Sequence, residues 1–220
     1  MARMARVVVE HYPHHIIQRG NRRQDTFFCN DDYRYYIGLM AEWCDKCGVA
    51  IWAYCLMPNH AHLIAVPESE DGLRRSIGEA HRRYTRHINV REEWRGHLWQ
   101  GRFASFLMDE QYLLTAARYI ELNPVKAGLI SVAEEYPWSS ARAHVTGEND
   151  ALVKVQPLLH MVDDWQQFLS GDVSDKEYQL LQRHERTGRP LGSKHFIEQL
   201  EKTLSRILTP QKGGRPKKNR

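Results

Sequence analysis

The chain has 220 residues, of which 42% are hydrophobic and 26% are charged. This composition is that of a soluble globular protein, and no apolar run approaches the ~20 residues of a membrane-spanning helix. The N-terminus lacks the apolar stretch and cleavage pattern of a signal peptide, so we expect a cytoplasmic protein. The net charge of +4 falls to −1 without the five basic residues of the last ten positions. Basic groups in the body must therefore cluster if they are to bind an anionic partner.

The four cysteines do not predict a disulfide framework, because disulfides are rare in a reducing cytoplasm. Cys44 and Cys47 have the spacing of half a zinc site, but no second pair follows. Both fall late in an amphipathic segment, which favours buried thiols.

The first elements in chain order are a strand over residues 14–18, a basic loop and a helix. The loop, residues 19–23, either binds phosphate groups or is a solvated turn. Asn30 is a suitable N-cap for a helix over 31–47, and Gly48 follows its last apolar position. The apolar residues of this helix recur at helical spacing, which indicates core packing.

A β-hairpin is predicted next, with strands over 50–56 and 60–66 joined by Pro58 and Asn59. Since residues two apart in a strand share a face, His60 and His62 should project side by side and Ala61 the other way. Two imidazoles so placed can bind one divalent metal ion. From spacing alone, two unrelated histidines at a strand end are an equal alternative.

A second helix is predicted over 70–90, and a fourth strand over 103–108. The helix carries several arginines outside its apolar stripe and few acids, which favours an anionic partner over a merely solvated face. A connector with glycine, aromatic and basic residues, 98–103, joins the two elements.

A third helix is predicted over 110–122, capped by Asp109 and ended by Pro124. Tyr112, Tyr119 and Asn123 share one of its faces, because offsets of seven and four residues are close to whole turns. A tyrosine on such a face usually packs, unless a metal site lies opposite.

The C-terminal part reads as helical. We expect a short helix over 137–145, a linker over 147–151, and further helices near 158–170, 174–184 and 193–208. The last residues are basic and rich in glycine, and resemble an AT-hook around Arg215.

Five blocks of sequence, in this order and at these spacings, resemble the HUH single-tyrosine transposases and specifically the REP-associated tyrosine transposases. The blocks are residues 19–24 (RGNRRQ), 56–63 (LMPNHAHL), 96–103 (GHLWQGRF), 118–129 (RYIELNPVKAGL) and 136–140 (YPWSS). Each block is weak alone, but the ordered set is specific. The resemblance covers about residues 1–145.

The resemblance implies an α+β fold, a ferredoxin-like antiparallel sheet with flanking helices. It also implies a division into a core, residues 1–145, a helical extension, 146–208, and a disordered basic tail, 209–220. By carry-over, His60 and His62 bind the metal, Tyr119 is the nucleophile, and Asn123 completes the metal site. Many relatives have Gln at that last position, so the shorter amide puts direct ligation by Asn123 in doubt.

The implied activity is metal-dependent cleavage and joining of single-stranded DNA through a 5′-phosphotyrosine, with Mg²⁺ or Mn²⁺ as cofactor. The implied substrate is a REP-type DNA hairpin, and the implied place is the cytoplasm, at the nucleoid. A monomer is preferred over a homodimer. Trp99 either stacks on a base or is a core tryptophan. The candidates for DNA binding are Arg19, Arg22, Arg23, Arg75, Arg82, Arg83, Arg86, Trp99, Arg102 and Arg215.

Two other functions stay open at this point. One is a DNA-hairpin-binding regulator with weak catalysis. The other is an unrelated metallohydrolase using His60 and His62, although such sites usually add His or Asp nearby and residues 63–66 offer none. Tyr112 is a reserve nucleophile because it shares a helix face with Tyr119.

Overall fold

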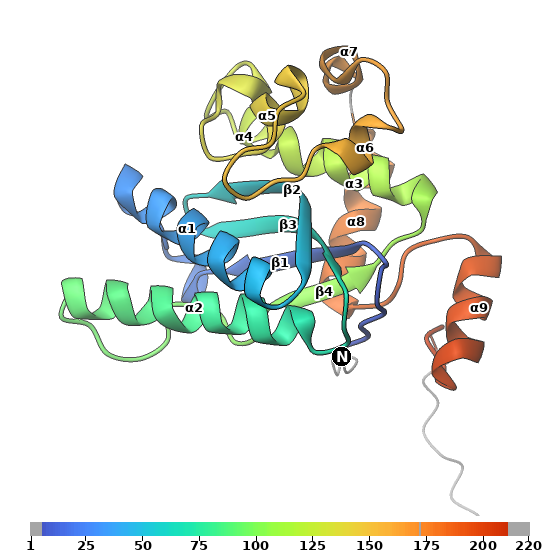
Figure 1. Ribbon diagram of the computed structural model, residues 1–220, viewed down its shortest axis with the longest axis horizontal. Coiled ribbons are helices and arrows are strands. Elements are labelled where there is room, and N and C mark those ends of the chain that lie inside the picture. Colours follow the sequence, from blue (N-terminus) through green and yellow to red (C-terminus); the bar gives the residue numbers. More distant parts are fainter. Residues whose placement is uncertain (1–5, 172, 211–220) are drawn as a thin grey trace, which may run out of the picture.

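The computed structural model describes residues 6–171 and 173–210 (Figure 1). Its centre is a four-stranded antiparallel sheet with strand order β2-β3-β1-β4, the order of the predicted ferredoxin-like fold. All four predicted strands are present, with ends that differ by at most one residue. The strands are β1 (His14–Arg19), β2 (Val49–Met57), β3 (His60–Pro67) and β4 (Ala104–Leu107).

Strand alternation separates the two faces of the sheet. On β3, Ala61 and Leu63 face one apolar cluster, whereas Ile64 faces the other. The pairing of β2 with β3 is irregular between Ile51 and Ala53, and these two residues belong to opposite clusters. A β-bulge of this kind changes which face the following residues present.

Helices α1 (Asn30–Lys46) and α2 (Gly72–Arg91) lie side by side over the first face (Figure 1). The N-cap of α1 is Cys29 and not the predicted Asn30, because the carboxylate of Asp32 accepts the backbone N–H groups of Phe28 and Cys29. Gly48 ends α1 as predicted. Its φ is +60°, and a Cβ there would lie 2.6 Å from a carboxylate oxygen of Glu68.

Helix α3 (Glu110–Glu121) covers the opposite face. The side chain of Asp109 caps α3, as predicted, by accepting the N–H of Tyr112. Pro124 stands in the first turn of a separate helix, as proline favours. The remaining helices are η1 (Asn21–Arg23), α4 (Asn123–Lys126), η2 (Ala133–Glu135), α5 (Ala141–Thr146), α6 (Gln156–Leu159), α7 (Trp165–Ser170), α8 (Asp175–Thr187) and α9 (Lys194–Leu204).

Two predicted helices differ from those observed. The helix predicted over 137–145 begins only at Ala141, because the segment before it bonds to β2: the carbonyl of Trp138, in a turn, accepts the N–H of Leu56, and Ser139 bridges Cys55. The helix predicted over 158–170 is divided into α6 and α7, since Asp164 starts α7 by capping it.

The C-terminal helices return to the sheet. Leu191 bridges Met108 beside β4, and Leu200 and Leu208 pack with Leu107 and Val7. None of the described helices has the length and apolar character needed to cross a bilayer. Cys44 and Cys47 are buried free thiols, as predicted, in the core under α1.

Candidate functional site

Strand β3 holds His60 and His62 on one face, as the alternation predicted. Their ring centroids are 4.9 Å apart, whereas Ala61 packs into the cluster on the other face. The Nδ1–H of His60 donates to Asn59 Oδ1 over 2.6 Å, which leaves Nε2 with its lone pair. Burial lowers the pKa of His60 to about 3 and that of His62 well below its ordinary value. Both rings are therefore neutral at neutral pH, the form that binds metal ions.

A third imidazole, His15 on β1, completes this cluster and was not predicted. Its Nε2 lies 2.9 Å from His62 Nδ1, and its ring packs on Phe106 with 5.0 Å between centroids. The side chain is fully buried, and burial lowers its pKa to about 3. The available signal was the ferredoxin-like order itself, because it places β1 beside β3 and His15 on the same face as His62.

Tyr119 reaches the cluster from α3. Leu113, Ala116 and Ile120 pack the helix onto the sheet, and the Tyr119 ring lies 5.5 Å from that of His62, centroid to centroid. Its hydroxyl donates to Glu185 Oε1 over 3.2 Å. Burial, and then the Glu185 carboxylate, raise the pKa of Tyr119 above its ordinary value, so the hydroxyl is protonated at neutral pH.

Glu185 of α8 is the carboxylate of the site, and no sequence block pointed to it. Its Oε1 is 3.8 Å from His62 Nδ1, and its Oε2 is 3.9 Å from Arg19 Nη2. Since His62 is neutral, the first contact is not an ion pair. Burial raises the pKa of Glu185 to about 7, and the charge of Arg19 opposes that rise.

The donors present fit a divalent metal ion. His15, His62 and Glu185 each offer an atom, and the three atoms lie within 4.8 Å of one another. His62 Nε2 is buried and has no hydrogen-bond partner among the described residues, which leaves its lone pair available. Imidazoles with a carboxylate suit transition metals such as Mn²⁺ better than they suit Mg²⁺, which prefers oxygen ligands.

An open cleft of about 660 Å³ leads to Tyr119. His60, Asn123 and Glu185 line it, so Asn123 does reach the same space as the predicted ligand His60. Among the described residues that line this cleft, Tyr119 and Tyr178 are the tyrosines. Tyr112 instead packs half-buried in the apolar cluster under α3.

Four arginines give the cleft a basic wall. Three of them, Arg19, Arg23 and Arg102, were predicted to bind DNA, and Arg186 of α8 was not. The predicted Arg22 is exposed beside Arg23 in η1.

The arginines of α2 lie elsewhere, on a helix that packs against the opposite face of the sheet from Tyr119. Arg75 and Arg86 are exposed, whereas Arg82 and Arg83 pair with Glu79. Arg82, Arg83 and Arg86 line a shallow surface hollow of their own. The structure therefore separates the predicted basic residues into two groups.

Trp99 was considered for base stacking, but its ring is in the core, 6% exposed. It packs against Phe27, His81 and Tyr84, which leaves no face for a base. The alternative reading, a core tryptophan, is therefore the correct one. Arg215 lies outside the described residues.

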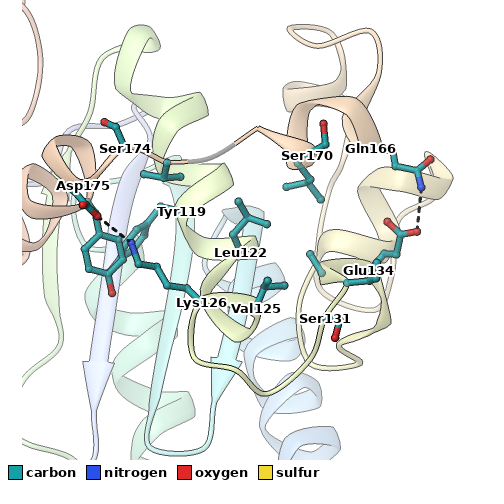
Figure 2. Close-up of a pocket in the computed structure, with 15 residues that line it drawn as sticks. Tyr119, Leu122, Val125, Lys126, Ser131, Glu134, Gln166, Ser170, Ser174 and Asp175 are labelled. Carbon is teal, nitrogen blue, oxygen red and sulfur yellow. Dashed lines mark hydrogen bonds and ion pairs between the residues drawn. The ribbon is translucent and has the colours of Figure 1, made fainter.

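Tyr119 also lines a second pocket, of about 720 Å³ (Figure 2). Leu122, Val125 and Lys126 line it from the end of α3 and from α4, and Asp175 lines it from α8. Lys126 Nζ is 3.9 Å from an Asp175 carboxylate oxygen. Tyr119 and Tyr178 thus line both this pocket and the basic cleft.

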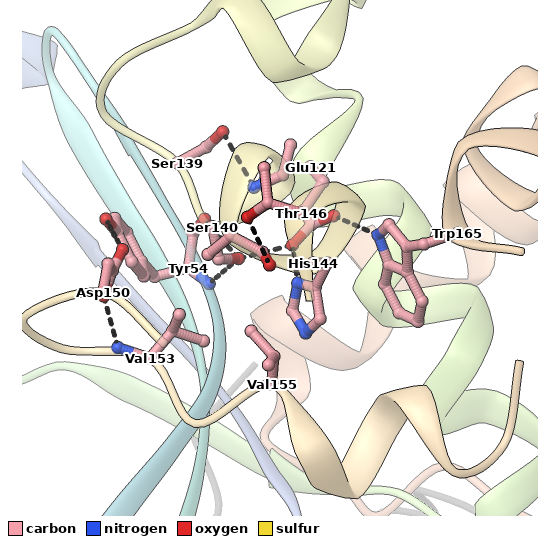
Figure 3. A network of polar contacts seen from close by, with 12 residues as sticks. Tyr54, Glu121, Ser139, Ser140, His144, Thr146, Asp150, Val153, Val155 and Trp165 are labelled. Atoms are coloured by element: carbon pink, nitrogen blue, oxygen red, sulfur yellow. Dashed lines mark hydrogen bonds and ion pairs between the residues drawn. The ribbon is translucent and has the colours of Figure 1, made fainter. Parts of the chain in front are cut away.

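A buried polar network fixes the end of α3, two residues beyond Tyr119 (Figure 3). The Glu121 carboxylate accepts hydrogen bonds from Ser140 Oγ, from His144 Nδ1 at 2.7 Å and from Trp165 Nε1 at 2.8 Å. Ser140 in turn bonds the backbone of Tyr54 on β2. The network joins α3 to the sheet, α5 and α7.

Comparisons with known proteins identify the family of the chain. The model of the family described as "Transposase IS200 like" matches residues 8–123, more than half of the chain. A curated Haemophilus influenzae protein named as a REP-associated tyrosine transposase is 32% identical over 107 residues. That match covers 44% of this chain and 61% of the relative, so the chain spans less than two thirds of the relative's length.

Two solved structures are also similar. A REP-associated tyrosine transposase bound to a REP hairpin superimposes with a TM-score of 0.60, at 20% identity, over 80% of this chain and 94% of that one. At that identity the likeness shows the fold. A transposase from Deinococcus radiodurans gives 0.37, at 20% identity, over 55% and 96% of the two chains, and adds no argument. The predicted resemblance is confirmed, and the chain belongs to the IS200-like transposase family.

Proposed function

We propose that this protein cleaves and rejoins single-stranded DNA through a covalent bond to Tyr119. The observation that carries the proposal is the Tyr119 hydroxyl, which lies beside His62 and Glu185 at the end of an arginine-lined cleft. A nucleophile, metal-binding groups and phosphate-binding groups in one cleft are the parts that a phosphodiester transfer needs.

In the proposed reaction Tyr119 Oη attacks the phosphorus, and the bond from phosphorus to the 3′ oxygen breaks. The products are a 5′-phosphotyrosine and a free 3′-OH. The Tyr119 proton passes to Glu185 Oε1, its hydrogen-bond acceptor at 3.2 Å, and the leaving oxygen takes up a proton. Because the phosphotyrosine conserves the bond energy, a 3′-OH can reverse the step without ATP.

His60 and His62 are the proposed ligands of a divalent metal ion, with Asn123 as the proposed third at the cleft wall. The neutral imidazoles and the unpartnered Nε2 of His62 support this assignment. A bound ion would supply positive charge where the phosphate becomes more negative. We expect Mn²⁺ to bind more tightly than Mg²⁺, because imidazole suits it better.

The proposed substrate is a REP-type DNA hairpin, the kind of DNA to which the solved REP-associated relative is bound. Arg19, Arg23 and Arg102 in the cleft would contact phosphates near the scissile bond, and the exposed arginines of α2 would contact a more distant part of the DNA. Arg215 would add affinity that tolerates sequence changes and falls with salt.

Three further proposals concern the whole chain. Tyr119 lies beside His62 of its own chain, which supports a monomer over a dimer that exchanges helices. We retain the division into a core (1–145), a helical extension (146–208) and a tail (209–220). We also retain a cytoplasmic location at the nucleoid, where the proposed DNA substrate lies.

The test is a labelled single-stranded hairpin incubated with the protein and either Mn²⁺ or EDTA. We expect a label on the protein that survives a denaturing gel, requires Mn²⁺, and is lost in Tyr119→Phe and in the double variant His60→Ala/His62→Ala. Tyr112→Phe and Tyr178→Phe are matched controls and should keep the adduct.

Other outcomes would redirect the assignment. Loss of the adduct in Tyr112→Phe alone would move the nucleophile two turns along α3. Cleavage without any adduct would indicate a metallohydrolase. Tight hairpin binding without cleavage would indicate the regulator.

A further inference from the structure

We propose that His15 positions His62 for metal binding, by accepting the Nδ1–H of His62 so that the Nε2 lone pair of His62 faces the ion. This inference rests on the proposed metal-dependent function and adds a residue to it. His15 belongs to none of the sequence blocks that carry the family resemblance.

The backbone sets the two rings beside each other. In the pairing of β1 with β3, Ile17 lies opposite His62, so His15 is two residues along β1 and on the same face. The ring centroids are 5.2 Å apart, and neither side chain has exposed surface. The 2.9 Å between His15 Nε2 and His62 Nδ1 is a hydrogen-bond distance.

Proton counting then assigns the roles. A neutral imidazole carries one N–H, so a histidine that binds an ion through one nitrogen has its proton on the other. His62 Nδ1 faces His15, whereas His62 Nε2 is buried without a partner among the described residues. Ligation through Nε2 therefore requires Nδ1–H of His62 to donate and Nε2 of His15 to accept. The proton of His15 is then on its Nδ1, which is also buried without a partner among the described residues, so each arrangement leaves one N–H unpaired and the bound ion selects this one. In the opposite arrangement the proton would sit on Nε2 of His62 and prevent ligation.

Glu185 cannot take over this hydrogen bond without movement. Its Oε1 lies 3.8 Å from His62 Nδ1, which is beyond hydrogen-bond distance. An apolar residue at position 15 could still pack on Phe106, but it would leave the buried Nδ1–H of His62 unpaired. The His62 proton could then lie on either ring nitrogen. Loss of such a partner typically weakens metal binding by about 10- to 100-fold.

The experiment measures Mn²⁺ binding to the full chain by the loss of the free-ion EPR signal. We expect His15→Leu to raise the Kd by about 10- to 100-fold. We expect His15→Gln to stay within a few-fold of the wild type, because its amide oxygen can accept where Nε2 did. His81→Leu is the matched control. It removes a buried histidine that bonds Tyr36 over 2.8 Å on the other face of the sheet, and it should leave the Kd unchanged.

Several results would overturn the proposal. Equal Kd values for the wild type and His15→Leu would mean that His15 only packs. Pulsed EPR with ¹⁵N-labelled histidine tests direct ligation by His15, which the short distances to His62 and Glu185 also allow. If the spectrum of His15→Gln shows one imidazole coupling fewer than that of the wild type, His15 itself binds the ion and the positioning role is wrong. Should His15→Leu not fold, His15→Met supplies a second apolar side chain.

The readouts separate this inference from the proposed function. A wild type that binds no Mn²⁺ contradicts both. A wild type that binds Mn²⁺ and forms the Tyr119 adduct, with an unaffected His15→Leu, contradicts the positioning role alone.

Discussion

The carboxylate of Glu121 should stabilise the folded state by several kcal/mol, and Glu121→Ala tests this prediction. Glu121, Ser140 and His144 are almost entirely buried, and Trp165 is 3% exposed. Alanine would leave two buried donors, His144 Nδ1–H and Trp165 Nε1–H, without an acceptor at about 1–3 kcal/mol each, whereas Ser140 Oγ–H keeps the Tyr54 carbonyl; the emptied space adds to the cost and water entering it would recover part. We expect a loss of about 3–5 kcal/mol in the free energy of unfolding, which for a chain of this size lowers Tm by roughly 10 °C.

Glu121→Gln should cause a smaller loss of stability than Glu121→Ala. Its amide oxygen can keep the hydrogen bonds from Ser140 and His144, but its NH₂ would face the N–H of Trp165, which should cost about 1–2 kcal/mol. The assay is urea unfolding, with the exposed Glu110→Ala on the same helix as a control within about 0.5 kcal/mol of the wild type. If Glu121→Ala costs less than ~1 kcal/mol, the network does not hold the end of α3 and the reasoning is wrong.

Three further predictions concern pH and salt. Burial raises the pKa of Asp32, but hydrogen bonds from Arg91 and the backbone lower it more, so the net pKa is below its ordinary value. The advantage of the wild type over Asp32→Asn should therefore be full above pH ~4 and shrink as pH falls further, measured by urea unfolding. In EDTA, Glu185 keeps its proton to about pH 7 in the folded state but loses it near ~4.3 when unfolded. Stability should thus fall with rising pH across that window, and Glu185→Gln should remove the fall; a parallel profile for the variant would contradict it. In hairpin binding, Arg23→Ala and Arg86→Ala should each reduce the slope of log K against log salt by ~0.7–0.9, and an unchanged slope excludes that arginine from phosphate contact.

Local patterns were sufficient to predict most of the fold. The alternation around His60 and His62 and the turn at Pro58 gave the hairpin, and Asp109 gave the start of α3, because these signals depend on neighbours in sequence. Asn30 failed as an N-cap because Asp32, two residues later, supplies the acceptor instead. Both residues are good caps, and only the approach of Arg91 from α2 distinguishes them.

Contacts between distant segments decide the residues that local patterns leave open or miss. Trp99 could stack on a base or pack in the core as far as its sequence shows, and in the structure it packs between α1 and α2. Glu185 lies in a helix with many charged residues and has no local feature that separates it from its neighbours. Its burial follows from the packing of α8 against β4 and α3, which no pattern within α8 encodes.

Asp109 joins α3, the helix of Tyr119, to the chain that follows α8, the helix of Glu185. Asp109 caps α3 with Oδ1, accepts the N–H of Ser193 with Oδ2 over 2.7 Å, and donates its own N–H to Leu191. The start of α3 and the chain just after α8 are therefore fixed to the same carboxylate, and the end of α3 is fixed by Glu121. Because both anchors act on α3, the distance between Tyr119 and Glu185 is set by the fold of the whole described chain. A site built only from residues 1–145 would lack Glu185, the carboxylate that accepts the hydrogen bond of the Tyr119 hydroxyl.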